Sequence, residues 1–427
     1  MGQSGRAVAC LAQSNGVDFV GFDEDPNSGF RVLSPDELSG FDAVVISPGF
    51  SKIHLWRKWA LESGKPCFGE LGYASRYWRG QLIGVTGTNG KTSGTQLLVA
   101  CFQAQGISVL ATGNIGFPLA DAVCAQENDS EAVAICEISS FQAEFSEGIE
   151  MDALLWTNFA PDHLDRYQSL SEYFEAKWQL IKCLKPGALF VCSKDVVAAC
   201  KEFGKTLPDT TLVADSSEMA DWLQGTAFER QPQIKNLQLV YSYWHQSEYA
   251  FSALKEGVQR FELPAHRLQR VENKHFDGAV FWNDSKATNF HAVRGALDAM
   301  TDAPVFWIGG GQDKGEPLMD LVRLLKGRVE HAFVYGETAP MLFETFINEG
   351  IEVERCNSLE NAVHRASEAA MAAGPAMAIP FTSARTPLPI QVLFSPGFAS
   401  FDQFKSYSER GKIFINEVLS LKARGRE

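Results

Sequence analysis

Residues 81–92 contain the feature that most restricts how this chain can fold. They read Gln-Leu-Ile-Gly-Val-Thr-Gly-Thr-Asn-Gly-Lys-Thr, an apolar strand that runs into a glycine-rich loop ending in Lys91 and Thr92. Glycines let successive backbone N–H groups turn toward one anion, Lys91 adds a positive charge, and the Thr92 hydroxyl suits a Mg²⁺ ion at the start of the next helix. Although Val85 replaces the usual first glycine, the segment predicts a triphosphate-binding loop rather than an ordinary strand-to-helix turn.

Length and composition exclude several classes of protein. A chain of 427 residues exceeds what one hydrophobic core usually serves, so two or three domains are expected. A formal net charge of −14 argues against a nucleic-acid partner, which needs a basic surface. The nine cysteines show no CxxC pair or zinc spacing and no secretory signal opens the chain, which is typical of reduced thiols in the cytoplasm. No apolar run approaches the ~20 residues that span a bilayer, so no membrane association is expected.

Alternating apolar and amphipathic runs predict α/β structure in three segments, 1–79, 80–265 and 266–427. In the first segment we expect strands at 17–22 and 42–46 and helices at 6–13 and 54–62. The strand that should precede the Gly2-Gln3-Ser4-Gly5 turn is missing from this sequence, so either the start is trimmed or the domain lacks an edge strand. In the second segment we expect strands at 81–86, 108–112, 132–138, 153–158 and 188–193, and helices at 91–105 and 170–184.

The third segment alternates in the same way. We expect strands at 278–282, 304–308, 332–335 and 391–394, and helices at 287–300, 317–326, 339–348, 359–373 and from 401 onward. Residues 225–262 have no clear pattern, residues 380–389 look like extra chain without an assigned role, and the charged run 422–427 is expected to fray.

Polar clusters follow several of these strands, where open α/β sheets bind their ligands. Glu137 ends an apolar strand and suits a hard cation, although Ser139 and Ser140 could instead build a helix cap there. Asp162, His163 and Asp165 follow the next strand and could bind metal or pin a loop.

Further candidates are less clear from spacing. Lys177 has the spacing of a solvated helical lysine. In the last segment, small or polar residues and one cation follow the strands at three places: His266-Arg267, 283–289 and 309–315. These cations could neutralise the negative charge of a phosphoryl group during its transfer.

Together these motifs resemble the Mur ligase family over nearly the whole chain. They comprise the loop at 87–92, Asn114-Ile115-Gly116, Glu137 with 139–142, Asn158 with 162–165, His266-Arg267, and Asn283-Asp284-Ser285-Lys286-Ala287-Thr288-Asn289. The segments 139–142, 283–289 and 395–404 are most similar to the family members that add D-glutamate.

The resemblance implies an α/β fold of three domains. These are a Rossmann-like UDP-sugar domain at 1–79, a central P-loop-type, mostly parallel ATPase domain at 80–265, and a Rossmann-like amino-acid-binding domain at 266–427. It also implies a cytoplasmic, monomeric, ATP-dependent ligase of peptidoglycan precursor synthesis. In this reaction the L-alanyl carboxylate of UDP-N-acetylmuramoyl-L-alanine attacks the γ-phosphate of ATP, and the amine of D-glutamate then attacks the acyl phosphate to form an amide.

The resemblance also implies roles for single residues. Lys91, Glu137, His163 and Lys177 match the catalytic positions. Two Mg²⁺ sites are implied, one at Thr92 and one at Glu137, His163 and a carbamylated Lys177. The nucleotide-binding positions are Gly87, Thr88, Asn89, Gly90, Lys91, Thr92, Ser93, Asn236, Arg267 and Asp284.

The remaining matches concern the other substrates. Asn114, Ser139 and Gln142 match muramoyl-alanyl contacts. Gly2, Ser4, Asp23, Ser47, Pro48 and Gly49 match the uridine-diphosphate site. Lys286, Thr288, Lys314, Ser400 and Tyr407 match positions that receive D-glutamate. The family's His-Asn-x-x-Asn motif is reduced here to Lys235-Asn236-Leu237-Gln238-Leu239. Two other functions remain open, a ligase of this type for another amino acid and a catalytically silent nucleotide-binding protein.

Overall fold

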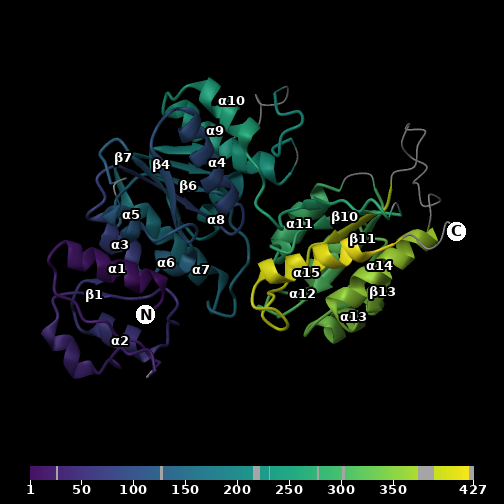
Figure 1. The fold of residues 1–427 in the computed structure, drawn as a ribbon, viewed down its shortest axis with the longest axis horizontal. Helices are drawn as coiled ribbons and strands as arrows, with labels where there is room; N and C mark the ends of the chain where they lie inside the picture. The colour runs from purple at the N-terminus through teal and green to yellow at the C-terminus, as the bar shows by residue number, and fades with distance from the viewer. Residues whose placement is uncertain are drawn as a thin grey trace. The chain divides into compact units, whose positions relative to one another are not determined.

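The computed structural model describes residues 1–25, 27–125, 128–214, 222–229, 231–276, 278–300, 303–373 and 389–422. These residues form two compact units, and each is described by itself. The first unit contains residues 1–160 and 166–261, apart from 230–232, and the second contains 161–165, 230–232 and the chain from 262 onward. Both units are α/β (Figure 1), which confirms the predicted fold class.

The first unit is built on a parallel sheet of six strands, ordered β4-β5-β3-β6-β7-β8. The strand bounds are Gln81–Thr86 for β3, Val109–Gly113 for β4, Val133–Glu137 for β5, Met151–Trp156 for β6, Leu184–Cys192 for β7 and Thr211–Val213 for β8. Every pairing in this sheet is parallel. Because β3 lies between β5 and β6, the residues that follow these three strands emerge side by side at one edge of the sheet.

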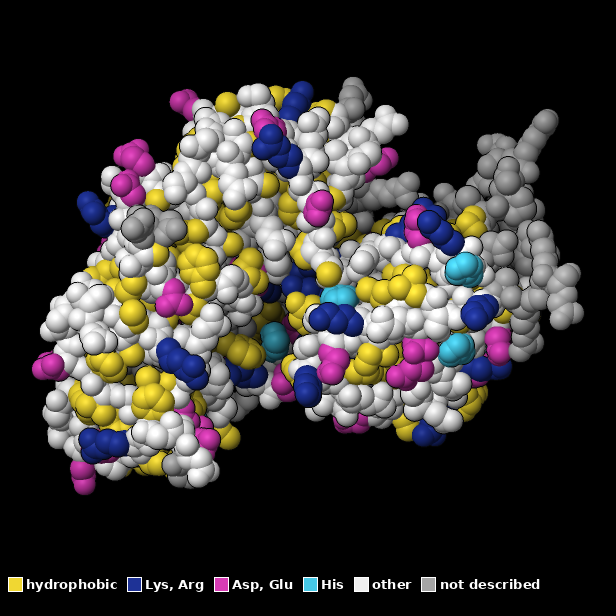
Figure 2. All heavy atoms as spheres, viewed as in Figure 1, with side chains coloured by type: hydrophobic (Ala, Val, Ile, Leu, Met, Phe, Trp, Pro, Cys, Tyr) yellow, Lys and Arg dark blue, Asp and Glu magenta, His cyan; other side chains and the backbone are white. Residues whose placement is uncertain are grey.

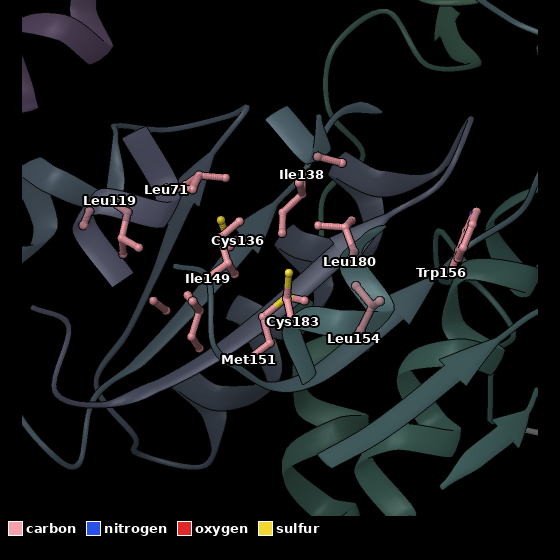
Figure 3. Close-up of a cluster of buried hydrophobic side chains, with 14 of the residues drawn as sticks. Leu71, Leu119, Cys136, Ile138, Ile149, Met151, Leu154, Trp156, Leu180 and Cys183 are labelled. Atoms are coloured by element: carbon pink, nitrogen blue, oxygen red, sulfur yellow. The ribbon is translucent and has the colours of Figure 1, made fainter. Parts of the chain in front are cut away.

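Helices cover this sheet and extend its core into residues 1–79. The helices are α1 at Gln3–Ser14, α2 at Leu55–Glu62, α3 at Glu70–Ser75, α4 at Lys91–Ala104, α5 at Leu119–Cys124, α6 at Ser140–Ala143, α7 at Leu170–Trp178, α8 at Lys194–Glu202, α9 at Gln233–Gln246 and α10 at Phe251–Arg260. Leu71 of α3 and Leu119 of α5 share one cluster with Cys136, Met151 and Leu154 of the sheet (Figure 3). Residues 1–79 are therefore packed onto the six-stranded sheet by a common apolar core.

The predicted strand at 17–22 is wrong. Only β1 at Val44–Val45 and β2 at Cys67–Phe68 pair in the described part of residues 1–79, and Phe22 makes a single isolated bridge to Arg31. Val17, Phe19 and Val20 are 42%, 47% and 43% exposed. An apolar run alone does not make a strand, because a strand also needs a neighbouring strand that shares its hydrogen bonds.

The second unit has a mixed sheet ordered β13-β12-β11-β14-β10-β9. The strand bounds are Gln269–Val271 for β9, Val280–Asn283 for β10, Val305–Gly310 for β11, His331–Tyr335 for β12, Val353–Arg355 for β13 and Gln391–Phe394 for β14. The pairing of β9 with β10 is antiparallel, and the others are parallel.

Two apolar clusters bury the two faces of this sheet. One contains residues of α14 (Leu359–Ala373) and α15 (Tyr407–Ser420), and the other contains residues of α11 (Phe290–Asp298), α12 (Leu318–Leu325) and α13 (Ala339–Asn348). The predicted strands and helices of this segment are present with shifts of one to three residues at several ends, and α15 begins six residues after the predicted start.

Some sequence-based expectations concern parts of the chain outside this description. Residues 380–388 and 423–427 lie outside the described residues, whereas the unclear stretch 225–262 contains α9 and α10. The domain boundaries at 79/80 and 265/266 remain predictions. No helix within the described ranges is long and apolar enough to cross a membrane. On the face drawn in Figure 2, basic side chains are interspersed with acidic ones.

Candidate active site

The predicted phosphate loop connects the end of β3 to the start of α4. Leu82, Ile83 and Val85 of β3 are buried, so the strand fixes the loop from within the core. Gly87 has φ of 145°, and a Cβ atom there would lie 1.9 Å from Thr157 Oγ1. A glycine at this position is therefore required by both the backbone conformation and the close approach of the neighbouring strand end.

The segment after β6 holds the loop in shape. The amide of Asn89 donates to Asn158 Oδ1 at 2.9 Å, and Asn158 Nδ2 donates back to the Asn89 carbonyl at 2.9 Å. The Thr88 hydroxyl donates to the Ala160 carbonyl and accepts from the Ala160 amide, both at 3.1 Å. These reciprocal bonds fix the conformation of the loop that leads into α4.

Lys91 begins α4, and its ammonium lies over the loop that it closes. Lys91 Nζ donates to the carbonyls of Gly87 and Thr88, both at 2.8 Å. Asn236 of α9 lies against the same loop, because a Cβ atom on Gly90 would come within 2.2 Å of Asn236 Oδ1. Asn236 is buried and also donates to Gln233 Oε1 at 3.0 Å. The structure thus brings the single remaining Asn of the altered motif to the phosphate loop.

Glu137 ends β5 beside the loop and is 2% exposed. Asn114, just after β4, donates from its side chain to Glu137 Oε1 at 2.8 Å and from its backbone to the Glu137 carbonyl at 2.8 Å. The other carboxylate oxygen, Oε2, is buried without a hydrogen-bond partner. A buried, unsatisfied carboxylate oxygen is costly unless a cation or donor occupies its neighbourhood.

The surroundings of Glu137 favour a hard cation. Across the described ranges, no group of three or more His, Cys, Asp and Glu side chains is arranged to hold a metal. Mg²⁺ does not need a cluster of three such side chains. In proteins it usually binds one or two carboxylates, and water and substrate oxygens complete its coordination, so Glu137 and the Thr92 hydroxyl could be sufficient protein ligands. The residues present therefore fit Mg²⁺.

Lys177 is buried, so the alternative of a solvated helical lysine is wrong. The residue is 1% exposed, and its Nζ donates to the Gly87 carbonyl at 2.9 Å and to Thr86 Oγ1 at 3.5 Å. The ammonium also lies 5.1 Å from the centre of the Tyr173 ring. Helix α7 thus directs Lys177 at the start of the phosphate loop, which its sequence spacing alone did not indicate.

A helix cap, which the sequence left open as an alternative built by Ser139 and Ser140, is present, but Ser139 forms it with Gln142. The Ser139 hydroxyl accepts from the Gln142 amide at 3.2 Å, and Gln142 Oε1 accepts from the Ser139 amide at 3.0 Å. This is a capping box at the start of α6. Gln142 nevertheless lines a pocket together with Ser4 and Pro48. A substrate contact by Gln142 remains a prediction.

The other predicted uridine-diphosphate positions are loop and cap residues. Gly2 is the N-cap of α1, so residues 2–5 start a helix. Asp23 accepts from the Asp25 amide at 3.0 Å, and Ser47 accepts from the Gly49 amide at 3.3 Å. Arg166, which the sequence did not single out, donates to the Phe50 carbonyl at 3.0 Å and pairs with the buried Glu144 at 3.2 Å.

Asp162 and His163 belong to the second unit. Asp162 is buried, pairs with the Lys314 ammonium, and accepts from Asn289 Nδ2 at 2.9 Å. Burial raises the pKa of Asp162, but the charges of Lys314 and His163 and the hydrogen bonds outweigh it and lower the pKa to about 2. His163 has φ of 56°, and its Nε2 lies 3.7 Å from Asp162 Oδ2. Asp162 therefore stabilises its loop through these contacts, which is the structural alternative to metal binding given above. Metal ligation by His163 remains a prediction.

Arg267 and Asp284, both predicted to contact nucleotide, are neighbours. Asp284 accepts from the Ser395 hydroxyl at 2.9 Å and from the Leu268 amide at 3.2 Å. Burial raises the pKa of Asp284 to about 7 despite these bonds and the nearby Arg267 charge. The adjacent Asn283 contacts His266 Nδ1 at 2.9 Å. Hydrogen bonds of Asn283 and Asp284 therefore connect the end of β10 to residues 266–268.

The buried guanidinium of Arg410 binds residues that adjoin or contact three of the five predicted D-glutamate positions, namely Lys286, Ser400 and Tyr407. Arg410 Nη1 donates to the carbonyls of Phe398 and Ala399 at 3.1 and 3.2 Å, and Nη2 donates to the Ser285 carbonyl at 2.9 Å. Ser285 Oγ in turn donates to the Tyr407 carbonyl at 2.8 Å.

Three of the predicted D-glutamate positions lie next to the residues that Arg410 contacts. Lys286 Nζ lies 5.1 Å from the Tyr407 ring centre, and Ser400 follows directly after Ala399. The loop before Lys314 joins the same group, because Gln312 and Ala399 exchange backbone hydrogen bonds at 2.9 and 3.0 Å. Thr288 adjoins Asn289, the N-cap of α11.

Comparison with known proteins agrees with this arrangement. Residues 85–254 match the Mur ligase middle domain, and residues 266–379 match the Mur ligase, glutamate ligase domain. The UDP-N-acetylmuramoylalanine--D-glutamate ligase of Protochlamydia amoebophila is 31% identical, with 97% of this chain and 95% of that protein covered. The chain belongs to the Mur ligase family. Like other Mur ligases, it is an ATP-dependent enzyme that joins an acid to an amino acid and uses Mg²⁺.

Further relatives extend this result. The enzyme of the same name from Aquifex aeolicus is 30% identical, with 97% of this chain and 96% of that protein covered. MurF from Acinetobacter baumannii has the same fold at a TM-score of 0.62 and 12% identity, covering 98% of each chain. UDP-N-acetylmuramate-alanine ligase MurC from Thermotoga maritima has a TM-score of 0.56 at 16% identity, with 98% of this chain and 97% of that chain covered. The three-domain architecture of Mur ligases is therefore that of this chain.

Sequence reasoning assigned no role to Asn158, Arg166 or Arg410. Asn158 follows β6, the apolar strand beside β3, which leads into the phosphate loop. A polar residue directly after such a strand was the signal that could have predicted its contact with the loop. Arg166 and Arg410 act through contacts with residues distant in sequence, for which a single sequence has no signal.

Proposed function

We propose that this Mur ligase adds D-glutamate to UDP-N-acetylmuramoyl-L-alanine and converts ATP to ADP and phosphate in the process. The observation that carries the proposal is its similarity, at about full length, to enzymes named as D-glutamate ligases. The grouping of Lys286, Ser400 and Tyr407 around Arg410 supports it, because cations and hydroxyls suit a substrate with two carboxylates. We further propose that the enzyme is a cytoplasmic monomer.

In the first step, the loop at 87–92 would bind the triphosphate of ATP. Its backbone N–H groups and the N-terminus of α4 would face the phosphate oxygens, and Lys91 would exchange its two loop carbonyls for the outer phosphates. Asn236, Arg267 and Asp284 would contact the rest of the nucleotide. Neutralised in this way, the γ-phosphate can be attacked by the L-alanyl carboxylate, which Asn114, Ser139 and Gln142 would orient.

Thr92 would hold one Mg²⁺ ion, and Glu137 would hold a second ion together with His163 and a carbamylated Lys177; both ions would supply positive charge to the phosphoryl group during transfer. The unsatisfied Oε2 of Glu137 supports its assignment as a ligand. Carbamylation adds CO₂ to the neutral amine with loss of one proton and converts the lysine end into a carboxylate, which is a ligand that Mg²⁺ prefers.

The second step would join D-glutamate to the activated acyl group. Lys286, Thr288, Lys314, Ser400 and Tyr407 would hold its two carboxylates so that its amine meets the acyl carbon. Orienting the two reactants in this way replaces a bimolecular encounter and accounts for much of the expected rate increase. The tetrahedral adduct then expels phosphate and leaves the amide.

The proposal is tested by the mass of the product. Incubation with ATP, Mg²⁺, UDP-N-acetylmuramoyl-L-alanine and single amino acids should yield a product only with D-glutamate, accompanied by phosphate release. Lys91→Ala should reduce release more than a hundredfold, because the outer phosphates lose the positive charge that Lys91 supplies. Lys58→Ala, at an exposed lysine of α2, is the matched control. A product with a different amino acid would refute the substrate assignment, and unchanged release by Lys91→Ala would refute the role of the loop.

Carbamylation of Lys177 has its own test. We expect Lys177→Ala to lose at least tenfold in rate and to recover part of it with formate or acetate, because a small carboxylate can occupy the space of the missing carbamate. The control is Lys182→Ala, which removes an exposed lysine that follows α7. Absence of rescue, or full activity without added carboxylate, would contradict the assignment.

A further inference from the structure

Cys10 and Cys124 differ from the other cysteines of the chain. All nine thiols are free, and seven are buried, at positions 67, 101, 136, 183, 192, 200 and 356. Cys10 and Cys124 are exposed. They are therefore the two that small oxidants and thiol reagents can reach, since reactivity requires access to solvent.

The two exposed cysteines lie on facing helices. Helices α1 and α5 lie against each other (Figure 1). Ala7 and Leu11 of α1 and Ala120 of α5 belong to the same buried cluster. Cys10 and Ser14 are one turn apart, so they share a side of α1. Small alanine side chains between α1 and α5 let the two backbones approach closely, as a disulfide between helices requires.

A contact of Ser14 places the side of α1 that carries Cys10 next to Cys124. The Ser14 hydroxyl lies 3.8 Å from Cys124 Sγ, which places this side of α1 against the end of α5. The pKa of Cys124 is raised, first by burial of its sulfur and also by interaction with the Cys10 thiol. The two thiols thus influence each other although they are more than a hundred residues apart in sequence.

We propose that Cys10 and Cys124 are a modification site at which a reversible disulfide fastens α1 to α5. The oxidant is a low-molecular-weight disulfide. One cysteine thiolate attacks a sulfur of the small disulfide and releases one small thiol, and the second cysteine then attacks this mixed disulfide and releases the other small thiol. The two protein sulfurs lose two electrons and two protons in total, and the small disulfide gains both.

The bond would change the stability of the first unit. Helix α1 and the sheet share one apolar core, so a bond to α5 closes a long loop between parts of the same cooperative structure. Closing a long loop restricts the unfolded chain, and we expect the melting temperature of the first unit to rise by about 5–10 °C. Added reductant should reverse the change.

The experiment uses the full-length protein and bis(2-hydroxyethyl) disulfide as the oxidant. Oxidation should remove two hydrogen atoms from the intact mass without adding the small thiol, and peptide mapping should recover the peptides of residues 10 and 124 as one linked species. Titration of accessible thiols should fall from two to zero. Either two mixed disulfides on a stable product, or a covalent dimer, would overturn the proposal.

Cys10→Ser and Cys124→Ser are the matched controls, because each removes one sulfur at an exposed position. After oxidation each variant should carry one mixed disulfide and show no rise in melting temperature. If either variant gains the same stability as the wild-type chain, a bond between Cys10 and Cys124 is not the cause and the proposal fails.

Discussion

Several side chains of the candidate active site act by holding backbone in place. The Asn158 side chain forms hydrogen bonds with the backbone amide and the backbone carbonyl of Asn89. The Arg410 side chain donates to the backbone carbonyls of Phe398, Ala399 and Ser285. Such residues are as necessary to a binding site as those that touch the ligand, because a ligand-binding loop that is not preorganised must lose conformational freedom on binding.

Replacement of Asn158 tests this role at the phosphate loop. Asn158→Ala removes two reciprocal hydrogen bonds to Asn89, each worth about 1 kcal/mol. We expect the KM for ATP to rise about tenfold, while the KM for D-glutamate changes little. Steady-state kinetics measure both constants. Asn361→Ala, which removes a side-chain contact to the Asn357 amide, is the control. An unchanged KM for ATP would show that the loop keeps its shape without Asn158.

Among the elements, the strand ends and the segments that follow them determine the site. In the first unit, β3, β5 and β6 are neighbours, so the phosphate loop, Glu137 and Asn158 emerge at one edge. In the second unit, the ends of β10 and β14 are joined by Arg410 of α15. A single helix thus fixes two loops whose residues are proposed to bind D-glutamate.

Arg410→Lys tests this link between elements. Lysine keeps the charge but cannot reproduce the planar fork of donors that reaches three carbonyls and a hydroxyl. We expect a loss of about 3 kcal/mol in the free energy of unfolding and a rise of at least tenfold in the KM for D-glutamate. Thermal unfolding and kinetics measure these effects. Arg323→Lys, at an exposed arginine of α12, should leave both unchanged; equal behaviour of the two variants would contradict the role of Arg410.

For the whole molecule, buried carboxyl groups connect stability to pH in both units. Burial raises the pKa of Glu70 in the first unit and of Asp284 in the second, each to about 7. Between the unfolded pKa near 4 and this value, the folded chain keeps protons that the unfolded chain has lost. Stability from these groups is therefore present below about pH 4 and declines as pH rises toward 7.

This gives a prediction for the pH dependence of unfolding. The melting temperature should fall between pH 5 and pH 8, and Glu70→Gln with Asp284→Asn should flatten the decline, because neutral amides do not titrate. Asp162 titrates near pH 2 and lies outside this range. Thermal unfolding at each pH measures the slope. A double variant with the wild-type slope would show that other groups control it.

Local pattern was sufficient for much of the fold. The bounds of β3, α13, α14 and β14 agree with the sequence prediction because a buried strand and an amphipathic helix each have a characteristic spacing of apolar residues. The strand predicted at 17–22 failed because this spacing does not reveal whether another strand lies beside it. The burial of Lys177, the pairing of Asp162 with Lys314 and the role of Arg410 also had no local signal.

The sequence by itself determined the phosphate loop, the α/β class and the family, since glycines, a lysine and a threonine at fixed spacing encode the loop locally. Only the tertiary structure decided which side chains support that loop. Asn158, Asn236 and Lys177 lie 69, 146 and 90 residues from their partners Asn89, Gly90 and Gly87 along the chain. Contacts over such separations form when helices and strands pack, and a single sequence carries no direct record of them.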